Sequence, residues 1–140
     1  MQGVCLEDLA IGQTAERRRA VTERDIETFA EVTGDVNPLH LDEAYARATT
    51  FGGRIAHGML SASYISAVLG TDLPGAGSIY VSQTLNFRRP VRIGDEVTAT
   101  VKVATIDAAR ARVTLETACV VGGKTVLDGE AVVIVPRRPQ

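Results

Sequence analysis

Hydrophobic residues recur at two different spacings along the chain, and the change of spacing predicts a change of secondary structure. Between residues 22 and 34 they recur every three or four positions, which is the spacing of one face of a helix. Thr22 and Asp25 stand three residues apart, as in a capping box, and Gly34 is suited to end the helix. We therefore predict a first helix between Thr22 and Gly34.

Two further helices are predicted before the middle of the chain. Asp42 is suited to cap a short helix that runs through Ala48. Residues 58–69 are apolar on almost every side of a helix, and their polar members are small serines. A helix with almost no polar face belongs in the interior of a protein. The pattern predicts a buried helix that ends at Gly70.

The second half of the chain has the pattern of β-strands. Residues 78–87 alternate between polar and apolar side chains, as a strand with one buried face does. Segments rich in valine and threonine follow at 96–105, 112–121 and 125–135 and are predicted to be strands. One more strand is predicted near the N-terminus, at 13–21. No long helical pattern separates these strands, so we predict an antiparallel sheet. We predict an α+β fold, one domain of residues 1–140, in which an antiparallel sheet wraps around a central buried helix.

The charge balance narrows the class of partner. The 140 residues include 15 basic and 17 acidic side chains, for a net charge of −2, and 4% aromatic residues with no tryptophan. Nucleic-acid binders usually present a strongly basic face or aromatic platforms for the bases. We expect no nucleic-acid partner.

The distribution of apolar residues predicts a cytoplasmic protein. The N-terminal MQGVCLEDLAIG lacks the basic-then-apolar pattern of a secretory signal. The most apolar stretch, residues 55–69, is short and interrupted by polar residues, so we expect no membrane span. Cys5 and Cys119 do not have the spacing of metal ligands. Two free thiols are the simple interpretation, and a single disulfide stays open.

Residues 34–42, GDVNPLHLD, gather ionisable and amide side chains around one proline. Pro38 fixes its own φ and pushes Asn37 toward extended backbone, which lets side chains on either side converge. If Asp35 and His40 share a water molecule, they can take a proton from it and return one elsewhere. Asn37 could orient one of the pair. Taken singly, each of these residues also fits an ordinary loop.

The segment RIAHGML, residues 54–60, places Gly58 at the start of the buried helix. Free N–H groups and the positive end of the helix dipole favour an oxygen with negative charge there, and glycine permits close approach. Such a site fits a thioester carbonyl as it becomes an enolate. We interpret His57 as a packing and hydrogen-bonding residue rather than a second base. Ser66 either points into the same pocket or bonds its own helix backbone.

These motifs resemble those of a known family. DVNPLHLD at 35–42, followed by AHGML at 56–60, resembles the hydratase-2 motif of MaoC-like hot-dog proteins. The segment GSIYVSQTLNFRRPVRIGDEVTATV, at 77–101, is similar to the family's strand region, and the similarity covers residues 6–135. The chain looks most like short single-domain (R)-specific enoyl-CoA hydratases, of the kind that feed polyhydroxyalkanoate synthesis. The resemblance implies a hot-dog fold and a homodimer with an active site near the dimer interface.

The resemblance also implies a reaction and roles for residues. Water would add to a trans-2-enoyl-CoA thioester without a metal or a redox cofactor. Asp35 and His40 would activate the water, and the Gly58 amide would bind the thioester oxygen. Ser66 would support the site by hydrogen bonding. Arg88, with its neighbours, either meets the phosphates of CoA or forms a solvated turn. The predicted substrate-binding residues are Asn37, Ser66, Tyr64, Ile65 and Arg88, with strand residues 131–133 shaping the acyl pocket.

Two other functions stay open at this point. A hot-dog thioesterase would use a carboxylate to drive attack on the thioester carbonyl itself, and the pairing of Asp35 with His40 argues against it. A non-catalytic acyl-CoA-binding module would be favoured if either residue of the pair were missing, and both are present.

Overall fold

The computed structural model describes residues 2–140 and contains one sheet and several helices. The helical elements are η1 (Leu6–Asp8), α1 (Glu23–Thr33), α2 (Pro38–Leu41), α3 (Glu43–Arg47) and α4 (Gly58–Thr71). The strands are β1 (Thr14–Ala20), β2 (Ile79–Gln83), β3 (Asn86–Phe87), β4 (Glu96–Asp107), β5 (Arg112–Val121) and β6 (Lys124–Ile134). None of the helices in this described part of the chain is long and apolar enough to cross a membrane.

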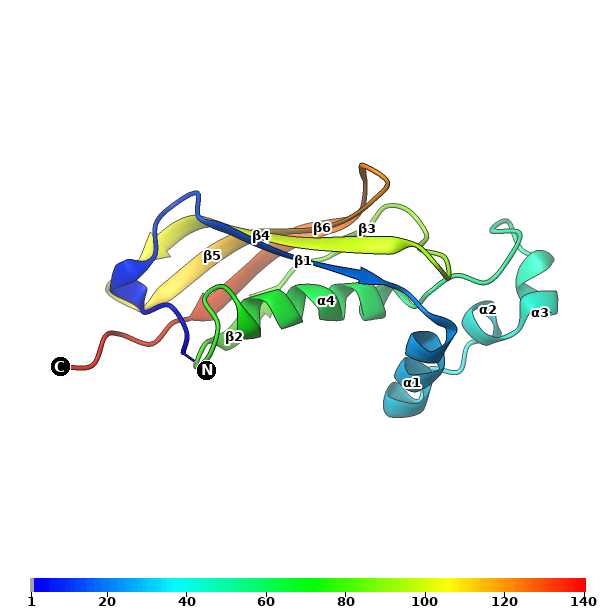
Figure 1. The fold of residues 1–140 in the computed structure, drawn as a ribbon, viewed down its shortest axis with the longest axis horizontal. Helices are drawn as coiled ribbons and strands as arrows, with labels where there is room; N and C mark the ends of the chain where they lie inside the picture. The colour runs from blue at the N-terminus through cyan, green and yellow to red at the C-terminus, as the bar shows by residue number, and fades with distance from the viewer. Residues whose placement is uncertain (1) are drawn as a thin grey trace.

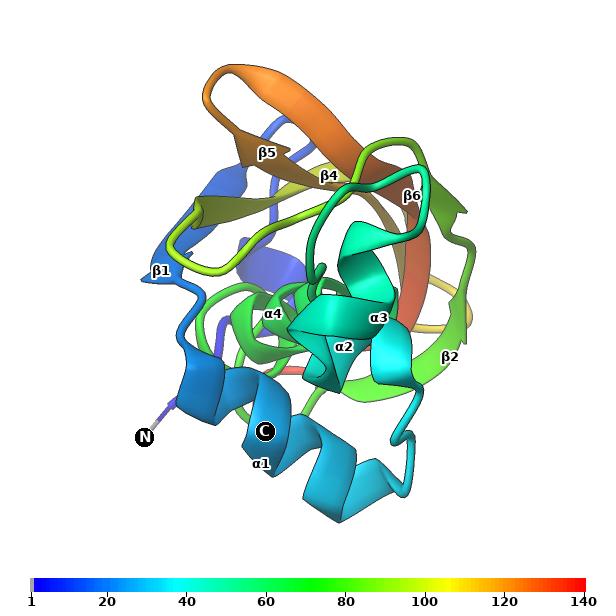
Figure 2. The same cartoon turned by 90° about the vertical axis from the view of Figure 1, so that its right-hand side faces the viewer.

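The sheet is antiparallel throughout and wraps around α4. Its strands follow the order β1-β4-β5-β6-β2, and β3 also pairs with β6. Figure 1 shows α4 lying along the concave side of the sheet, and Figure 2 shows the strands curving over that helix. This confirms the predicted α+β fold and its central helix.

Alternation along the long strands builds the core. In β4 and β5 every second side chain is buried, and these side chains meet Ile65, Val68 and Leu69 of α4. All three helix residues are at most 2% exposed. Because the side chains of a strand alternate between its two faces, one valine-rich face of each strand is enough to cover the helix.

Most predicted elements are confirmed, with small shifts at their ends. Thr22 and Asp25 form the predicted capping box of α1, and Gly34 ends that helix with a φ of 80°. Asp42 accepts a hydrogen bond from the Tyr45 N–H and caps α3. The predicted end of α4 at Gly70 is wrong by one residue, because the helix continues through Thr71.

The predicted single strand over residues 78–87 is wrong, and the burial of α4 is incomplete on one side. The segment 78–87 is not one strand: β2 has a bulge between Tyr80 and Ser82 and is separated from the two-residue β3. Its apolar residues are largely exposed, since Ile79 is 60% and Phe87 is 54% exposed. In addition, α4 is not enclosed on all sides, because a stripe of its surface is exposed along residues 59, 63, 66, 67 and 70.

The short helices gather beyond one end of the sheet, at the N-terminus of α4. Figure 1 shows α1, α2 and α3 at this end, opposite the two chain termini. The bend that we predicted at Pro38 is a one-turn helix, so His40 lies on a helix rather than in a loop. Proline is well suited to the first turn because the N–H that it lacks has no partner inside the helix.

Candidate active site

The turn between α1 and α2 places the two predicted acid–base residues. Asn37 caps α2, since its Oδ1 accepts a hydrogen bond of 3.0 Å from the Leu39 N–H. The Asn37 N–H in turn donates to Oδ1 of Asp35 at 3.2 Å. Asp35 thus enters the turn with its carboxylate held, and His40 follows from the single turn of α2. These are local side-chain-to-backbone bonds of the kind that Asn and Asp form readily.

His40 has a fixed tautomer. Its ring is buried, and Nδ1 lies 2.8 Å from the carbonyl oxygen of Ile55. Because a carbonyl oxygen only accepts, Nδ1 carries the proton and donates it in this hydrogen bond. In the neutral ring, Nε2 therefore holds a free lone pair, which is the atom that a general base needs.

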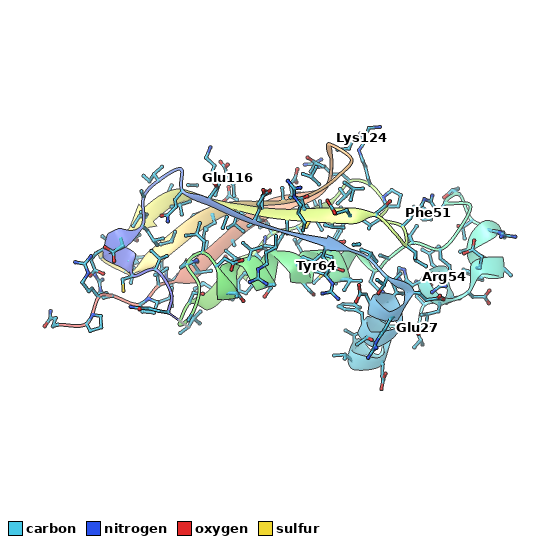
Figure 3. The ribbon with its side chains drawn as sticks, in the orientation of Figure 1. Glu27, Phe51, Arg54, Tyr64, Glu116 and Lys124 are labelled. Atoms are coloured by element: carbon cyan, nitrogen blue, oxygen red, sulfur yellow. The ribbon has the colours of Figure 1, made fainter. Side chains whose placement is uncertain are left out.

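Arg54 holds the helix that carries His40. Its Nε donates to the His40 carbonyl oxygen at 2.7 Å, and its Nη1 pairs with Oε1 of Glu23 on α1 at 2.7 Å. The Arg54 side chain is only 10% exposed, whereas that of Glu23 is 59% exposed, so the pair stays open to screening from the Glu23 side. Figure 3 shows Arg54 on the connection between the short helices and α4. The arrangement ties α2 to α1.

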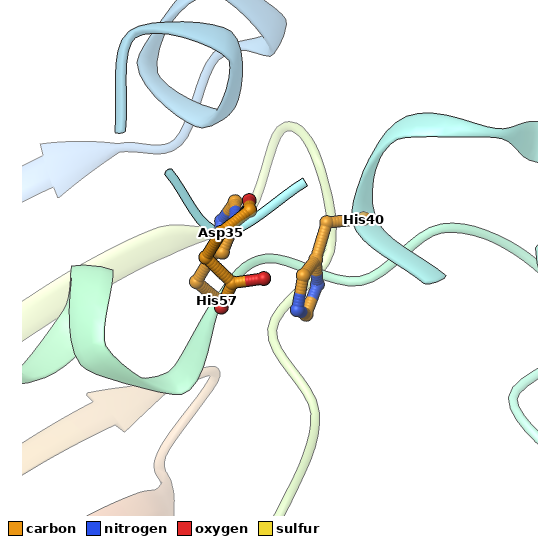
Figure 4. A group of neighbouring side chains, drawn as sticks. All are labelled: Asp35, His40 and His57. Atoms are coloured by element: carbon orange, nitrogen blue, oxygen red, sulfur yellow. The ribbon is translucent and has the colours of Figure 1, made fainter. Parts of the chain in front are cut away.

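The side chains of Asp35, His40 and His57 form a compact cluster. Each offers a nitrogen or carboxylate oxygen within 4.8 Å of the others. Figure 4 shows a carboxylate oxygen of Asp35 turned toward the His40 ring, with His57 beside Asp35. Such donors also suit divalent metals, so the absence of a metal stays a prediction.

Burial favours the neutral form of His40. Desolvation lowers the pKa of His40 below its usual value of 6.5, and the nearby imidazole of His57 lowers it further. The hydrogen bond to the Ile55 carbonyl and the Asp35 carboxylate act in the opposite direction. The net lowering favours the neutral ring, which is the form with a free Nε2.

Gly58 begins α4 beside the cluster. A side-chain Cβ at this position would lie 2.7 Å from Cε1 of Phe87, so the ring of β3 packs directly on the glycine backbone. Asp35, His40, Gly58 and Phe87 line one open cavity of about 520 Å³. The first N–H groups of a helix have no partner within it, so the start of α4 offers donors to an oxygen in this cavity.

The other predicted residues divide between this cavity and its surroundings. Arg88 lines the cavity and pairs with Oδ2 of Asp128 at 2.7 Å. Asn37 is occupied as the cap of α2 and is outside the lining. Tyr64 and Ser66 line two neighbouring grooves on either side of the exposed stripe of α4. Ile65 is fully buried in the core. Their roles toward a substrate stay predictions.

Sequence reasoning missed part of the wall of the cavity. Ser61 is buried on α4 and lines it, three residues after Gly58, which is a spacing that places both on one helical face. Phe51, Val126 and Leu127 complete an apolar side. The helical spacing was a usable signal for Ser61, whereas the contribution of β6 depends on strand pairing that the sequence does not specify.

Comparison with known proteins places this site in a family. The family described as MaoC like domain matches residues 8–126. The chain belongs to the MaoC-like family.

Two curated relatives and a solved structure extend the match over nearly the whole MaoC-like chain. An (R)-specific enoyl-CoA hydratase of Rhodospirillum rubrum is 54% identical over 94% of this chain and 92% of its own. A 3-hydroxybutyryl-CoA dehydratase of Methylorubrum extorquens is 53% identical over 96% and 85%. The solved (R)-hydratase from Aeromonas caviae, involved in PHA biosynthesis, is 44% identical, with a TM-score of 0.90 over 93% of this chain and 99% of its own. The hot-dog fold is thereby confirmed.

The close approach of Phe87 to Gly58 predicts the effect of a methyl group in this MaoC-like site. Gly58→Ala keeps the backbone N–H but brings Cβ against the Phe87 ring. We expect the free energy of unfolding to fall by about 1–3 kcal/mol, the usual range for overpacking. In a Phe87→Ala background the same change should lower the free energy of unfolding by much less, because the ring that Cβ would meet is gone. Urea unfolding of the four proteins measures this coupling, and an equal loss in both backgrounds would contradict it.

Proposed function

We propose that this protein adds water reversibly to trans-2-enoyl-CoA and forms (R)-3-hydroxyacyl-CoA. The observation that carries the proposal is the cluster itself: an imidazole with a free Nε2 and a carboxylate lie together beside the first N–H groups of α4. These are the groups that the reaction requires, namely a base, a partner that orients water, and a donor to oxygen. The names of the curated relatives support the same reaction.

The chemistry follows from the positions of these groups. A thioester oxygen bound at the Gly58 N–H draws electron density from the double bond and leaves C3 electrophilic. His40 Nε2, with Asp35, holds a water molecule and takes one of its protons as the oxygen bonds to C3. The pair then returns a proton to C2, so that one water is consumed and no proton is left over. No redox or metal step is needed, and we propose that the enzyme uses no cofactor.

The charges at the cavity suit the CoA part of the substrate. Arg88 and Arg89 both line the cavity, and Arg88 is already paired with Asp128. Arg89 therefore has more freedom to meet a phosphate. The sequence left two alternatives, a thioesterase and a non-catalytic binding module. No contact described in the site favours either of them.

We further propose that the protein is a homodimer that pairs through β2. The sheet has two outer strands, β1 and β2. Strand β1 reads TAERRRA, and its charges protect it from edge pairing, whereas β2 reads IYVSQ and has no charge. Ile79 and Val81 of β2 are both exposed, and Val81 lines a groove that it shares with Ser63 and Ser66 of the exposed stripe of α4. A second copy on this surface would cover both.

The proposed cellular setting follows from the sequence and the relatives. We propose that the protein acts in the cytoplasm and that it supplies (R)-3-hydroxyacyl-CoA to polyhydroxyalkanoate synthesis. Support for the second comes from the role stated for the Aeromonas caviae hydratase.

The function is tested together with the two acid–base residues. Purified protein is incubated with enoyl-CoA esters of increasing chain length while the enoyl absorbance and free thiol are followed, and the product is resolved on a chiral column. We expect loss of enoyl absorbance, (R) product and no thiol. Asp35→Asn and His40→Gln should each lower kcat by roughly 10²–10⁴-fold. Thiol release would instead indicate a thioesterase, and wild-type rates in both variants would reject the site.

The lowered pKa of His40 predicts the pH dependence. The base must be neutral in the free enzyme, and a lowered pKa keeps it neutral further into the acid range than an ordinary histidine. We expect the midpoint of the acid limb of kcat/KM to lie below 6.5, the usual pKa of a histidine. A pH profile with crotonyl-CoA measures this midpoint. A midpoint above that value would contradict the proposed state of His40.

The dimer proposal predicts an effect of charge on one edge only. The double variant Ile79→Lys, Val81→Lys places like charges where two β2 strands would meet, and both positions are exposed in the single chain. We expect a folded monomer by sedimentation equilibrium, because facing lysines repel one another. Arg18→Glu on β1 is the matched control and should leave the dimer intact. A dimer that survives the β2 change, or is lost in the control, would show that another surface is used.

A further inference from the structure

His57 contacts both members of the proposed acid–base pair. It precedes α4, and its side chain makes no cap on that helix. Instead, its Nε2 lies 3.0 Å from the carbonyl oxygen of Asp35. Because a carbonyl only accepts, Nε2 carries the proton and donates it. The start of α4 is thereby tied to the turn that holds the Asp35 carboxylate.

The ring of His57 also forms a surface for His40. The centroids of the two imidazoles are 4.0 Å apart, and their planes differ by 30°. Phe29 of α1 contacts the His57 ring at a centroid distance of 4.9 Å. His57 is only 2% exposed, so the ring is fixed by packing as well as by its hydrogen bond. One rigid side chain thus sets the place of the Asp35 backbone and of the His40 ring.

His57 does not have the features of a second base. Its Nε2 is occupied by the Asp35 carbonyl. Its Nδ1 is buried and has no hydrogen-bond partner among the described residues. A group that exchanges protons with substrate or water must reach them. The contacts with Asp35 and His40 are therefore the ones through which His57 can act.

We propose that His57 is a positioning residue for the hydration, a role that rests on the function proposed above. It holds the Asp35 carboxylate and the His40 ring at the separation that lets both contact one water molecule. Displacement of a reacting group by about 1 Å can lower a rate by roughly 10²-fold. A side chain that bridges the two groups is thus expected to affect kcat far more than KM.

The same contact influences the charge on His40. The groups that face this ring are His57, the Asp35 carboxylate and the Ile55 carbonyl, and the Arg54 guanidinium binds its main-chain oxygen. The His57 imidazole lowers the pKa of His40, after burial itself. Removal of that imidazole is expected to raise the pKa of His40 and to move the acid limb of kcat/KM to higher pH.

Two substitutions separate the hydrogen bond from the ring contact. His57→Phe keeps an aromatic face against His40 and Phe29 but loses the donor to Asp35. His57→Gln keeps an N–H donor of similar reach but loses the ring. We expect His57→Phe to lower kcat by roughly 10²-fold with little change in KM, and His57→Gln to lose less if the Asp35 bond dominates. Both should raise the acid-limb pKa.

A control measures what loosening alone does. Phe29→Leu weakens the packing on the far side of His57 without touching either member of the pair. It should lower Tm, lower kcat far less than His57→Phe does, and leave the pH profile unchanged, because the His57 imidazole and its bond to Asp35 remain. If it lowers kcat as much as His57→Phe at an equal loss of Tm, packing alone explains the effect and the proposal fails. A wild-type kcat in His57→Phe would also overturn it.

NMR separates this proposal from the proposed function. The chain has two histidines, so each His57 variant leaves His40 as the sole source of imidazole signals. Its titration reports the pKa of His40 without any turnover. A raised pKa in both variants supports the contact even if no enoyl-CoA is hydrated, in which case the function fails and the contact stands. An unchanged pKa together with wild-type kcat would reject the positioning role while the hydratase activity stands.

Discussion

The burial of α4 is the constraint on which the rest of the structure depends. Its inner side chains, such as Ile65 and Leu69, cannot face water without a large loss of stability, so the sheet must cover them. A sheet that curves over one helix leaves the helix ends open. The N-terminus of α4, with Gly58 and its free N–H groups, therefore emerges beside the short helices that carry Asp35 and His40. The location of the site follows from how the core is closed.

Hydrogen bonds to main-chain carbonyls then hold the site in register. His40 donates to Ile55, Arg54 donates to His40, and His57 donates to Asp35. Each bond joins the turn around α2 to the segment that leads into α4. A carbonyl acceptor also fixes the tautomer of each imidazole, because the ring nitrogen that faces the carbonyl must carry the proton. The geometry of the site and the identity of its free nitrogen thus have one origin.

The sequence predicted what local chemistry determines. Capping by Thr22 and Asp42, the apolar pattern of α4 and the motif with Asp35 and His40 all depend on neighbours within a few residues. The bulge after Tyr80, the exposed side of β2 and the cavity wall from β6 depend on pairing between distant strands, so no local pattern reveals them. The strand prediction at 78–87 failed for a further reason, since alternation predicts which residues share a face and not what covers that face.

The contact between the two histidines joins structure to chemistry in the cluster. Two imidazoles at 4.0 Å in a buried site cannot both be charged without strong repulsion. One of them must stay neutral, and the hydrogen bonds decide which atom of each ring is then free. In His40 the free atom is Nε2. In His57 it is a buried Nδ1 that does not reach solvent. The same packing that brings the rings together therefore makes one a base and the other a support.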